Sequence, residues 1–264
     1  MADSDYIHGY GLVEEQRLRD QARILAPVVI EQLSFPKNAT VLEVGCGVGA
    51  ELELLLANFP TLSLTGIEID QRHLQAAKDR LPEQVTLIQG DAKALPFPDG
   101  TFDAVLTIWV LEHVNDPEQV MREALRVLKP TGRLICTEVD NDTMHFNADL
   151  PMIQYWWKLF SQKQTEAGGD PFIGRKLADL AHGLSARNVE TTVIRPVSSS
   201  DSPTKRIEFL NYLEELFVSG VEHLQQSGMA TQEMLQELQA EFTRAKNDPT
   251  VECEYHGVRL ICSP

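Results

Sequence analysis

Glu43, Glu68 and Asp91 stand where carboxylates could hold a ligand. Glu43 lies in a short apolar run that leads into a glycine-rich turn at 45–49, and Glu68 and Asp91 each follow a later apolar run. Glycines at alternate positions let the backbone turn tightly and approach a ligand closely. The helix expected directly after the turn leaves its first N–H groups free. A strand, a glycine turn and a helix in this order predict a nucleotide-type ligand.

Glu43 narrows the kind of ligand. Its carboxylate, two residues before the first glycine, would repel a pyrophosphate and attract an ammonium group. S-adenosylmethionine carries an ammonium, a sulfonium and an adenosine, so it fits this turn. The run 45–50 also satisfies the looser dinucleotide pattern that ends in alanine. An NAD-dependent oxidoreductase therefore stays an alternative, against which Glu43 and the absence of a recognisable hydride-transfer motif both count.

Strands and helices that would position these groups alternate along the chain. Apolar runs predict strands at 41–44, 62–68, 85–89, 103–108 and 133–139, and helices at about 50–58, 71–81 and 117–128. Asp116 and Pro117 are expected as the N-cap and first residue of the last of these helices, and the Lys-Pro-Thr-Gly sequence at 129–132 as its stop. Regular alternation predicts an α/β fold with a Rossmann-like, doubly wound sheet of parallel strands.

The flanking segments are expected to be largely helical. The patterns predict a helix at about 12–33 bent by Pro27, helices at 149–167 and 174–186, a strand near 190–195, a helical pair over 204–246 with a loop at Ser227-Gly228, and a last strand at 251–262 that could run antiparallel. With the last two strands the sheet would have seven strands. We expect a single domain over 1–264, divided into an N-terminal helical flap (1–36), a cofactor-binding core (37–140) and a substrate-side half (141–264) with a helical cap at about 200–250.

The order of segments from about 41 to 138 resembles the class I S-adenosylmethionine-dependent methyltransferases, in their small-molecule, methyltransferase-domain branch. The resemblance rests on the segments VLEVGCGVG (41–49), GIEID (66–70), QGDA (89–92), LPFPDGTFD (95–103), LEHV (111–114) and RVLKPTG (126–132). It implies transfer of a methyl group from S-adenosylmethionine to an O, N or C nucleophile of a small molecule, with S-adenosylhomocysteine as product. A non-catalytic S-adenosylmethionine-binding regulatory protein and a protein methyltransferase are the alternatives.

Particular residues are expected to hold this cofactor. Glu68 follows the glycine turn by about 20 residues, the offset at which an acid meets ribose hydroxyls, although it could instead cap a helix. Asp91 could accept from an adenine amine and the Ala92 N–H could donate to a ring nitrogen, although Asp91 could simply close a turn. The full cofactor set, partly implied by the resemblance, is Tyr10, Arg17, Glu43, Gly45, Cys46, Gly47, Glu68, Ile69, Asp91, Ala92, Thr107 and Trp109.

His113 is the candidate catalytic residue. A neutral imidazole just past the fourth strand could remove a proton from a hydroxyl or amine as the methyl transfers, although the Leu-Glu-His-Val string could serve only packing. The substrate candidates are Glu138, Asp140 and His145, from a string that also holds Asn141 and Asp142, together with Tyr155 and Trp156. Consecutive aromatic residues cannot all face one way on a helix, so at most one or two of 155–157 would reach a substrate.

Composition limits the partners. The net charge is −16 and no basic cluster is present, which argues against nucleic acid or an acidic membrane surface as a partner. No apolar run approaches the ~20 residues of a membrane span. The N-terminus lacks a signal-peptide pattern, and the four cysteines have no metal-binding spacing. We expect a reduced, cytoplasmic protein with a small-molecule substrate and no metal. Exchange of the N-terminal helix between subunits would allow a homo-oligomer.

Overall fold

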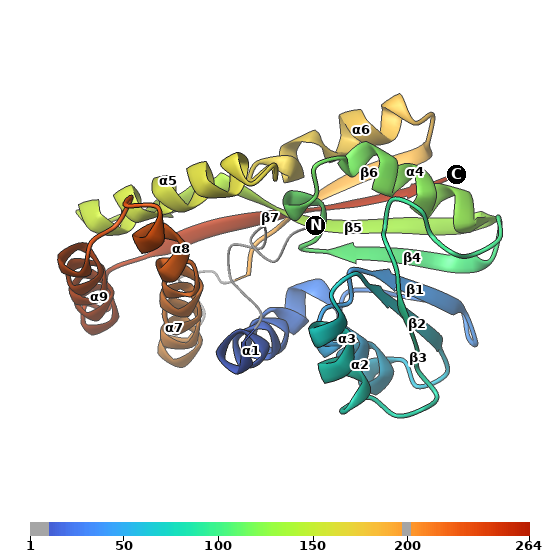
Figure 1. The fold of residues 1–264 in the computed structure, drawn as a ribbon, viewed down its shortest axis with the longest axis horizontal. Coiled ribbons are helices and arrows are strands. Elements are labelled where there is room, and N and C mark those ends of the chain that lie inside the picture. Colours follow the sequence, from blue (N-terminus) through green and yellow to red (C-terminus); the bar gives the residue numbers. More distant parts are fainter. Residues whose placement is uncertain (1–10, 197–201) are drawn as a thin grey trace.

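The computed structural model describes residues 11–196 and 202–264, and these form a seven-stranded sheet in the order β3-β2-β1-β4-β5-β7-β6 (Figure 1). The strands are β1 (Thr40–Val44), β2 (Ser63–Glu68), β3 (Thr86–Gln89), β4 (Phe102–Ile108), β5 (Leu128–Phe146), β6 (Arg187–Ile194) and β7 (Cys253–Ser263). The pairs from β3 to β5 are parallel, whereas β7 runs antiparallel to both β5 and β6. The predicted seven-stranded Rossmann-like α/β fold is confirmed, with β7 making the sheet mixed.

The helices follow the predicted pattern closely. They are α1 (Leu12–Val29), α2 (Ala50–Asn58), α3 (Gln71–Lys78), η1 (Leu111–His113), α4 (Pro117–Val127), α5 (Pro151–Glu166), η2 (Ile173–Lys176), α6 (Leu177–Gly183), α7 (Pro203–Ser219), α8 (Val221–Gln226) and α9 (Gln232–Asn247). Asp116 caps α4 as predicted, because its side chain accepts from the N–H of Gln119. Within the two described ranges, none of these helices is both long and apolar enough to cross a bilayer.

Alternate residues of the central strands serve two separate cores. Val41 and Leu106 belong to a cluster that includes α1, α2 and the C-terminal helices. Leu42 and Val105 belong to a second cluster with α4 and α6 on the other face. This period of two is what a strand buried on both faces requires. The parallel pairing of β1 with β2 and β4 brings their carboxyl ends to one edge of the sheet.

β5 is much longer than the strand predicted at 133–139, and this is the main correction to the predicted fold. It begins at Leu128, which pairs with Phe102 of β4, so the expected stop sequence lies within the strand. It continues to Phe146, which pairs with Cys253 of β7. In this extension, β7 provides hydrogen-bond partners for the backbone N–H and C=O groups of β5, which lets the strand continue. The two strands form a ribbon that leaves the sheet toward α9 (Figure 1).

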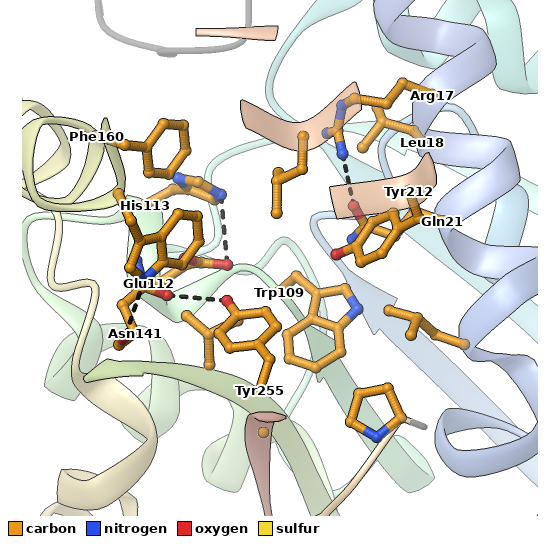
Figure 2. Close-up of a pocket in the computed structure, with 16 residues that line it drawn as sticks. Arg17, Leu18, Gln21, Trp109, Glu112, His113, Asn141, Phe160, Tyr212 and Tyr255 are labelled. Carbon is orange, nitrogen blue, oxygen red and sulfur yellow. Dashed lines mark hydrogen bonds and ion pairs between the residues drawn. The ribbon is translucent and has the colours of Figure 1, made fainter. Parts of the chain in front are cut away.

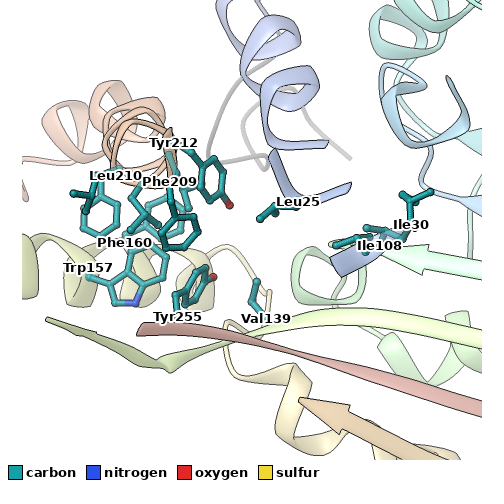
Figure 3. Close-up of a cluster of buried hydrophobic side chains, with 14 of the residues drawn as sticks. Leu25, Ile30, Ile108, Val139, Trp157, Phe160, Phe209, Leu210, Tyr212 and Tyr255 are labelled. Atoms are coloured by element: carbon teal, nitrogen blue, oxygen red, sulfur yellow. The ribbon is translucent and has the colours of Figure 1, made fainter. Parts of the chain in front are cut away.

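The insertion predicted as a helical pair consists of three helices, α7, α8 and α9, which form a cap together with α5. Ser202 and Thr231 accept backbone N–H groups at the starts of α7 and α9, as good N-caps do. Gly228, with φ of 73°, lies in the predicted loop. Figure 3 shows one continuous apolar cluster from Leu25 of α1 across Val139 to the aromatic residues of the cap.

α1 ends at Val29, four residues before the predicted end, and Pro27 lies within its last turn. Arg259 of β7 is buried beneath this end, and its guanidinium donates to the carbonyls of Val28 and Val29 at 2.8 and 2.6 Å. A cation at a helix C-terminus satisfies carbonyls that lack helical partners and complements the helix dipole. Arg259 therefore ties α1 to the sheet.

Candidate active site

The glycine turn after β1 has a backbone shape that glycine adopts most readily. Gly45, Gly47 and Gly49 have φ of 69°, 50° and 76°, the left-handed region in which a Cβ is strained. The N–H groups of Gly45 and Cys46 donate to the carbonyl of Ile67 at 2.8 and 3.1 Å. The turn is thereby fixed against the end of β2.

Glu68 is held at the junction of this turn with β2. One carboxylate oxygen accepts from the N–H of Gly47 and the other from that of Asp70, each at 2.9 Å. Burial raises the pKa of Glu68, while these backbone donors lower it. The structure thus brings the residue predicted for the ribose directly against the glycine turn.

Glu43 is a buried acid without a partner for one of its oxygens. It is 2% exposed, and its Oε2 accepts no hydrogen bond from the described residues. Burial raises the pKa of Glu43 well above its ordinary range, and the carboxylates of Glu51 and Glu68 raise it further. Such an oxygen is costly unless a proton or a cationic group meets it. This carboxylate oxygen beside the glycine turn therefore fits a cofactor that carries an ammonium group.

Glu51, at the start of α2, was not predicted and belongs to the same cluster of acids. Burial raises the pKa of Glu51 to about 7, while a backbone hydrogen bond and the charge of Arg17 lower it. The signal that could have found it was an acid in the first turn of the helix after the glycines, where N–H groups are free.

The residues predicted to contact the adenine lie where β2 and β3 end. These strand ends are paired, so Ile69 and Asp91 come to the same edge. Ile69 is 43% exposed, unusually so for a large apolar residue. The exposed Asp91 closes a turn over Ala92 by accepting from the N–H of Lys93 at 2.9 Å. The turn-capping alternative is therefore present in the structure, and a ligand role of Asp91 stays a prediction.

Two members of the predicted cofactor set have side chains that face the protein interior. Cys46 is 2% exposed, and burial raises the pKa of its thiol well above the usual range. Thr107 is fully buried in β4, beside the thiol of Cys136. Cys46 follows β1 in the glycine turn and Thr107 lies within β4, so a cofactor role of either residue stays a prediction. Tyr10 lies outside the described residues.

A cavity of about 50 Å³ lies between α1, η1, the cap and the ribbon of β5 and β7 (Figure 2). It is lined by Arg17, Leu18, Gln21, Leu25, Trp109, Glu112, His113, Val139, Asn141, Trp157, Phe160, Pro196, Tyr212, Leu216, Tyr255 and Gly257. Its volume holds a few water molecules. Three predicted residues meet there: Arg17, Trp109 and His113.

Trp109 is held in a strained conformation at the cavity wall. Its φ is 55°, although it is not glycine, and its N–H donates to the carbonyl of Thr137 at 2.9 Å. Gly257 leaves room for the indole, because a Cβ there would come within 3.0 Å of the ring. Backbone strain of this kind clusters at functional sites.

Arg17 enters the cavity already paired. Its guanidinium donates to both oxygens of Glu14 at 2.7 and 2.6 Å and to the side-chain oxygen of Gln21 at 2.7 Å. A bidentate pair of this geometry is a strong one. A ligand carboxylate would therefore share or replace Glu14.

His113 is partly exposed and sits among polar groups. Its Nε2 lies 3.7 Å from Oε1 of Glu112. The other oxygen of Glu112 accepts from Nε2 of Gln164 at 2.8 Å, and this amide lies 3.5 Å from Nδ1 of His113. A carboxylate beside an imidazole stabilises the imidazolium that forms when the ring takes up a proton.

Glu138 and Asp140 are engaged by groups of the protein and do not line the cavity, so their role as substrate residues stays a prediction. Glu138 is fully buried and accepts from the N–H groups of Val110 and Leu111 at 3.2 and 3.0 Å. Burial and the nearby Glu112 raise the pKa of Glu138 to about 8. The two carboxylate oxygens of Asp140 accept from Nε and Nη2 of Arg175. These are structural partners, because each carboxylate is satisfied by groups of this chain.

His145, Tyr155 and Trp156 also lie away from the cavity. His145 is exposed on the far part of the ribbon, where it lies opposite Glu254 of β7 in the strand register. Tyr155 is 49% exposed. Trp156 is fully buried in the cap, and its Nε1 donates to the carbonyl of Phe217 at 3.0 Å. The helix turns Trp157 toward the cavity in their place.

Several cavity residues were missed because they come together only through long-range packing. The hydroxyl of Tyr255 donates to Oδ1 of Asn141 at 2.9 Å, and Nε1 of Trp157 donates to the carbonyl of Asn141 at 2.8 Å. Phe160 and Tyr212 complete the wall. Asn141 stood in the string of polar residues after the fifth strand, but nothing in the sequence linked it to Tyr255.

Comparison with known proteins places this site in a family. The methyltransferase domain model matches residues 42–136. A demethylmenaquinone methyltransferase of Bacillus licheniformis is 36% identical over 179 residues, which cover 61% of this chain and 76% of that protein. A ubiquinone/menaquinone biosynthesis C-methyltransferase of Desulfotalea psychrophila is 29% identical over 170 residues, covering 64% and 65%. The match to this chain covers only 52%, 65% and 57% of the length of three of its relatives.

The fold agrees with this assignment. A solved putative methyltransferase from an antibiotic biosynthesis pathway of Anabaena variabilis superposes with a TM-score of 0.62 at 18% identity, covering 92% of this chain and 96% of that one. The fold and the glycine-turn site are those of a class I methyltransferase. The chain belongs to the S-adenosylmethionine-dependent methyltransferases, whose cofactor is S-adenosylmethionine. Within the described part of the chain, no group of three or more His, Cys, Asp or Glu side chains is arranged to hold a metal ion.

Proposed function

We propose that this protein transfers a methyl group from S-adenosylmethionine to an O, N or C nucleophile of a small molecule bound in the cavity under the cap. The observation that carries the proposal is the contact between the two parts of the site. A Cβ on Gly45 would meet the side chain of Val110 at 2.7 Å, so the glycine turn packs against the segment that carries Trp109 and His113. A donor held by the turn and an acceptor in the cavity would therefore be neighbours.

The residues of the turn bind the cofactor in this proposal. Glu43 receives the ammonium group, Glu68 the ribose hydroxyls, and Ile69, Asp91 and Ala92 the adenine. When bound, the cofactor would supply a methyl group carried on a sulfonium. A lone pair of the acceptor would form the new bond to the methyl carbon, and the electron pair of the carbon–sulfur bond would stay on sulfur. Alignment of the reacting atoms provides most of the rate gain in such a transfer.

His113 is the base for an acceptor that must lose a proton. Glu112, whose Oε1 lies 3.7 Å from Nε2 of His113, stabilises the resulting imidazolium. The cavity of about 50 Å³ admits only a small acceptor as it stands. Larger acceptors require α1 and the cap to separate.

The named relatives support the small-molecule class of acceptor. They include enzymes named for menaquinone, sterol and rifamycin substrates. These names describe the substrates of those proteins and do not identify the acceptor of this chain.

Incubation of the protein with a metabolite extract and methyl-labelled S-adenosylmethionine, followed by mass spectrometry, tests the proposal. We expect a labelled small molecule that is absent when His113→Ala and Trp109→Ala variants replace the native chain. Binding of S-adenosylhomocysteine without any labelled product from the extract would instead support the regulatory alternative. Label on protein alone would support the protein methyltransferase alternative.

A further inference from the structure

We propose that the acceptor is a small amine, recognised in its protonated form by aromatic rings and by the carboxylate of Glu112. This inference rests on the proposed function, since it names the class of molecule that the same cavity receives. It selects N from the O, N and C nucleophiles that the family resemblance allows.

The cavity wall is rich in aromatic rings that come from separate elements. Trp109, Phe160, Tyr212 and Tyr255 surround a common space in Figure 2. Trp157 lies stacked between Phe160 and Phe217, with centroid distances of 5.3 and 4.7 Å, so it presents its edge. Ring faces carry negative electrostatic potential and attract ammonium groups, most strongly where water is excluded.

The charged side chains of the cavity also favour an ammonium group as ligand. Among the described lining residues, Arg17 is the only lysine or arginine, and Glu14 neutralises it through two hydrogen bonds. Glu112 is 7% exposed, and its side chain contacts Gln164 and His113 but no lysine or arginine in the described part of the chain. The cavity therefore holds one uncompensated carboxylate.

A buried carboxylate discriminates between ligands by charge. An acid or a phosphate would be repelled by Glu112, and a neutral apolar acceptor would leave it desolvated without compensation. An ammonium group would pair with it while its carbon skeleton packs on the rings. Before transfer the ammonium gives one proton to His113, which frees the nitrogen lone pair; after transfer the methylated nitrogen again carries the positive charge.

Three probes of one shape test the inference: tert-butylammonium, tert-butanol and trimethylacetate, titrated by ligand-observed NMR into protein saturated with S-adenosylhomocysteine. We expect the ammonium to bind roughly tenfold more tightly than the alcohol, and the carboxylate to bind least. Glu112→Gln should remove most of this preference, whereas the exposed Glu83→Gln should preserve it. Equal binding of ammonium and alcohol to the native protein would overturn the inference.

Tyr212→Leu, compared with Tyr212→Phe, gives a second, independent arm if Glu112→Gln does not fold. Leucine removes the ring face that phenylalanine keeps, so in Tyr212→Leu the ammonium should weaken while the alcohol does not. Equal loss for both probes would contradict a role of the ring face. Failure of S-adenosylhomocysteine to bind the native protein would instead refute the proposed function, which keeps the two failures distinct.

Discussion

The proposed cofactor half of the site and the proposed acceptor half are assembled in different ways. In the cofactor half, Glu43, Gly47 and Glu68 come from one strand–turn–helix–strand unit, and backbone N–H groups hold Glu68. In the acceptor half, side chains from α1, η1, β5, α5, α7 and β7 hold one another, as Tyr255 holds Asn141. One half is therefore specified by a short stretch of sequence, and the other by the packing of the whole chain.

The cap should show the largest effect on stability, without an effect on cofactor binding. Trp156 is fully buried, so Trp156→Ala should lower the free energy of unfolding by about 3–5 kcal/mol. The exposed neighbour provides the control, since Tyr155→Ala should change it by less than about 0.5 kcal/mol. Urea denaturation followed by circular dichroism measures both. Equal effects of the two substitutions would show that the assignment of Trp156 to the core is wrong.

The cofactor half should respond most strongly to the loss of Glu68. A hydrogen bond to a charged group contributes about 1.5–3 kcal/mol, so Glu68→Ala should weaken S-adenosylhomocysteine binding roughly 10- to 100-fold. Calorimetry measures the affinity, with the exposed Glu53→Ala of α2 as control. Native affinity in Glu68→Ala would remove Glu68 from the site.

Glu138, which joins β5 to η1 between the two halves, should make stability depend on pH. Its pKa is raised from an ordinary 4.5 to about 8 in the folded protein. The folded state therefore keeps a proton that the unfolded chain loses in this range, and the free energy of unfolding falls as pH rises through it. The slope from one group is at most about 1.4 kcal/mol per pH unit.

Urea denaturation at about pH 5 and about pH 8 tests this dependence. Glu138→Gln should flatten the fall, because a glutamine carbonyl still accepts from Val110 and Leu111 without titrating. An equally steep fall in the variant would assign the dependence to other groups, among them Glu51, whose pKa is raised to about 7.

The smallest effect is expected within the acceptor half. Tyr255→Phe removes the hydrogen bond of 2.9 Å to Asn141 and should cost about 1 kcal/mol. We expect the KM for the acceptor to rise several-fold while the affinity for S-adenosylhomocysteine stays unchanged. A change in cofactor affinity instead would mean that the two halves are not separable.

This difference explains what could be predicted from the sequence. Strands of the core and the cap of α4 at Asp116 follow from local patterns, and so does the approach of Glu68 to the glycine turn. The extension of β5 to Phe146 could not be predicted, because it depends on a partner strand at the other end of the chain. For the same reason the pairing of Asp140 with Arg175 could not be predicted, since the two residues are 35 positions apart.

The most direct test of the account is a crystal structure with S-adenosylhomocysteine bound. We expect the ammonium to lie at Glu43, the ribose at Glu68 and the sulfur to face the cavity between Trp109 and His113. A cofactor whose sulfur faces away from that cavity would contradict the claim that donor and acceptor meet there.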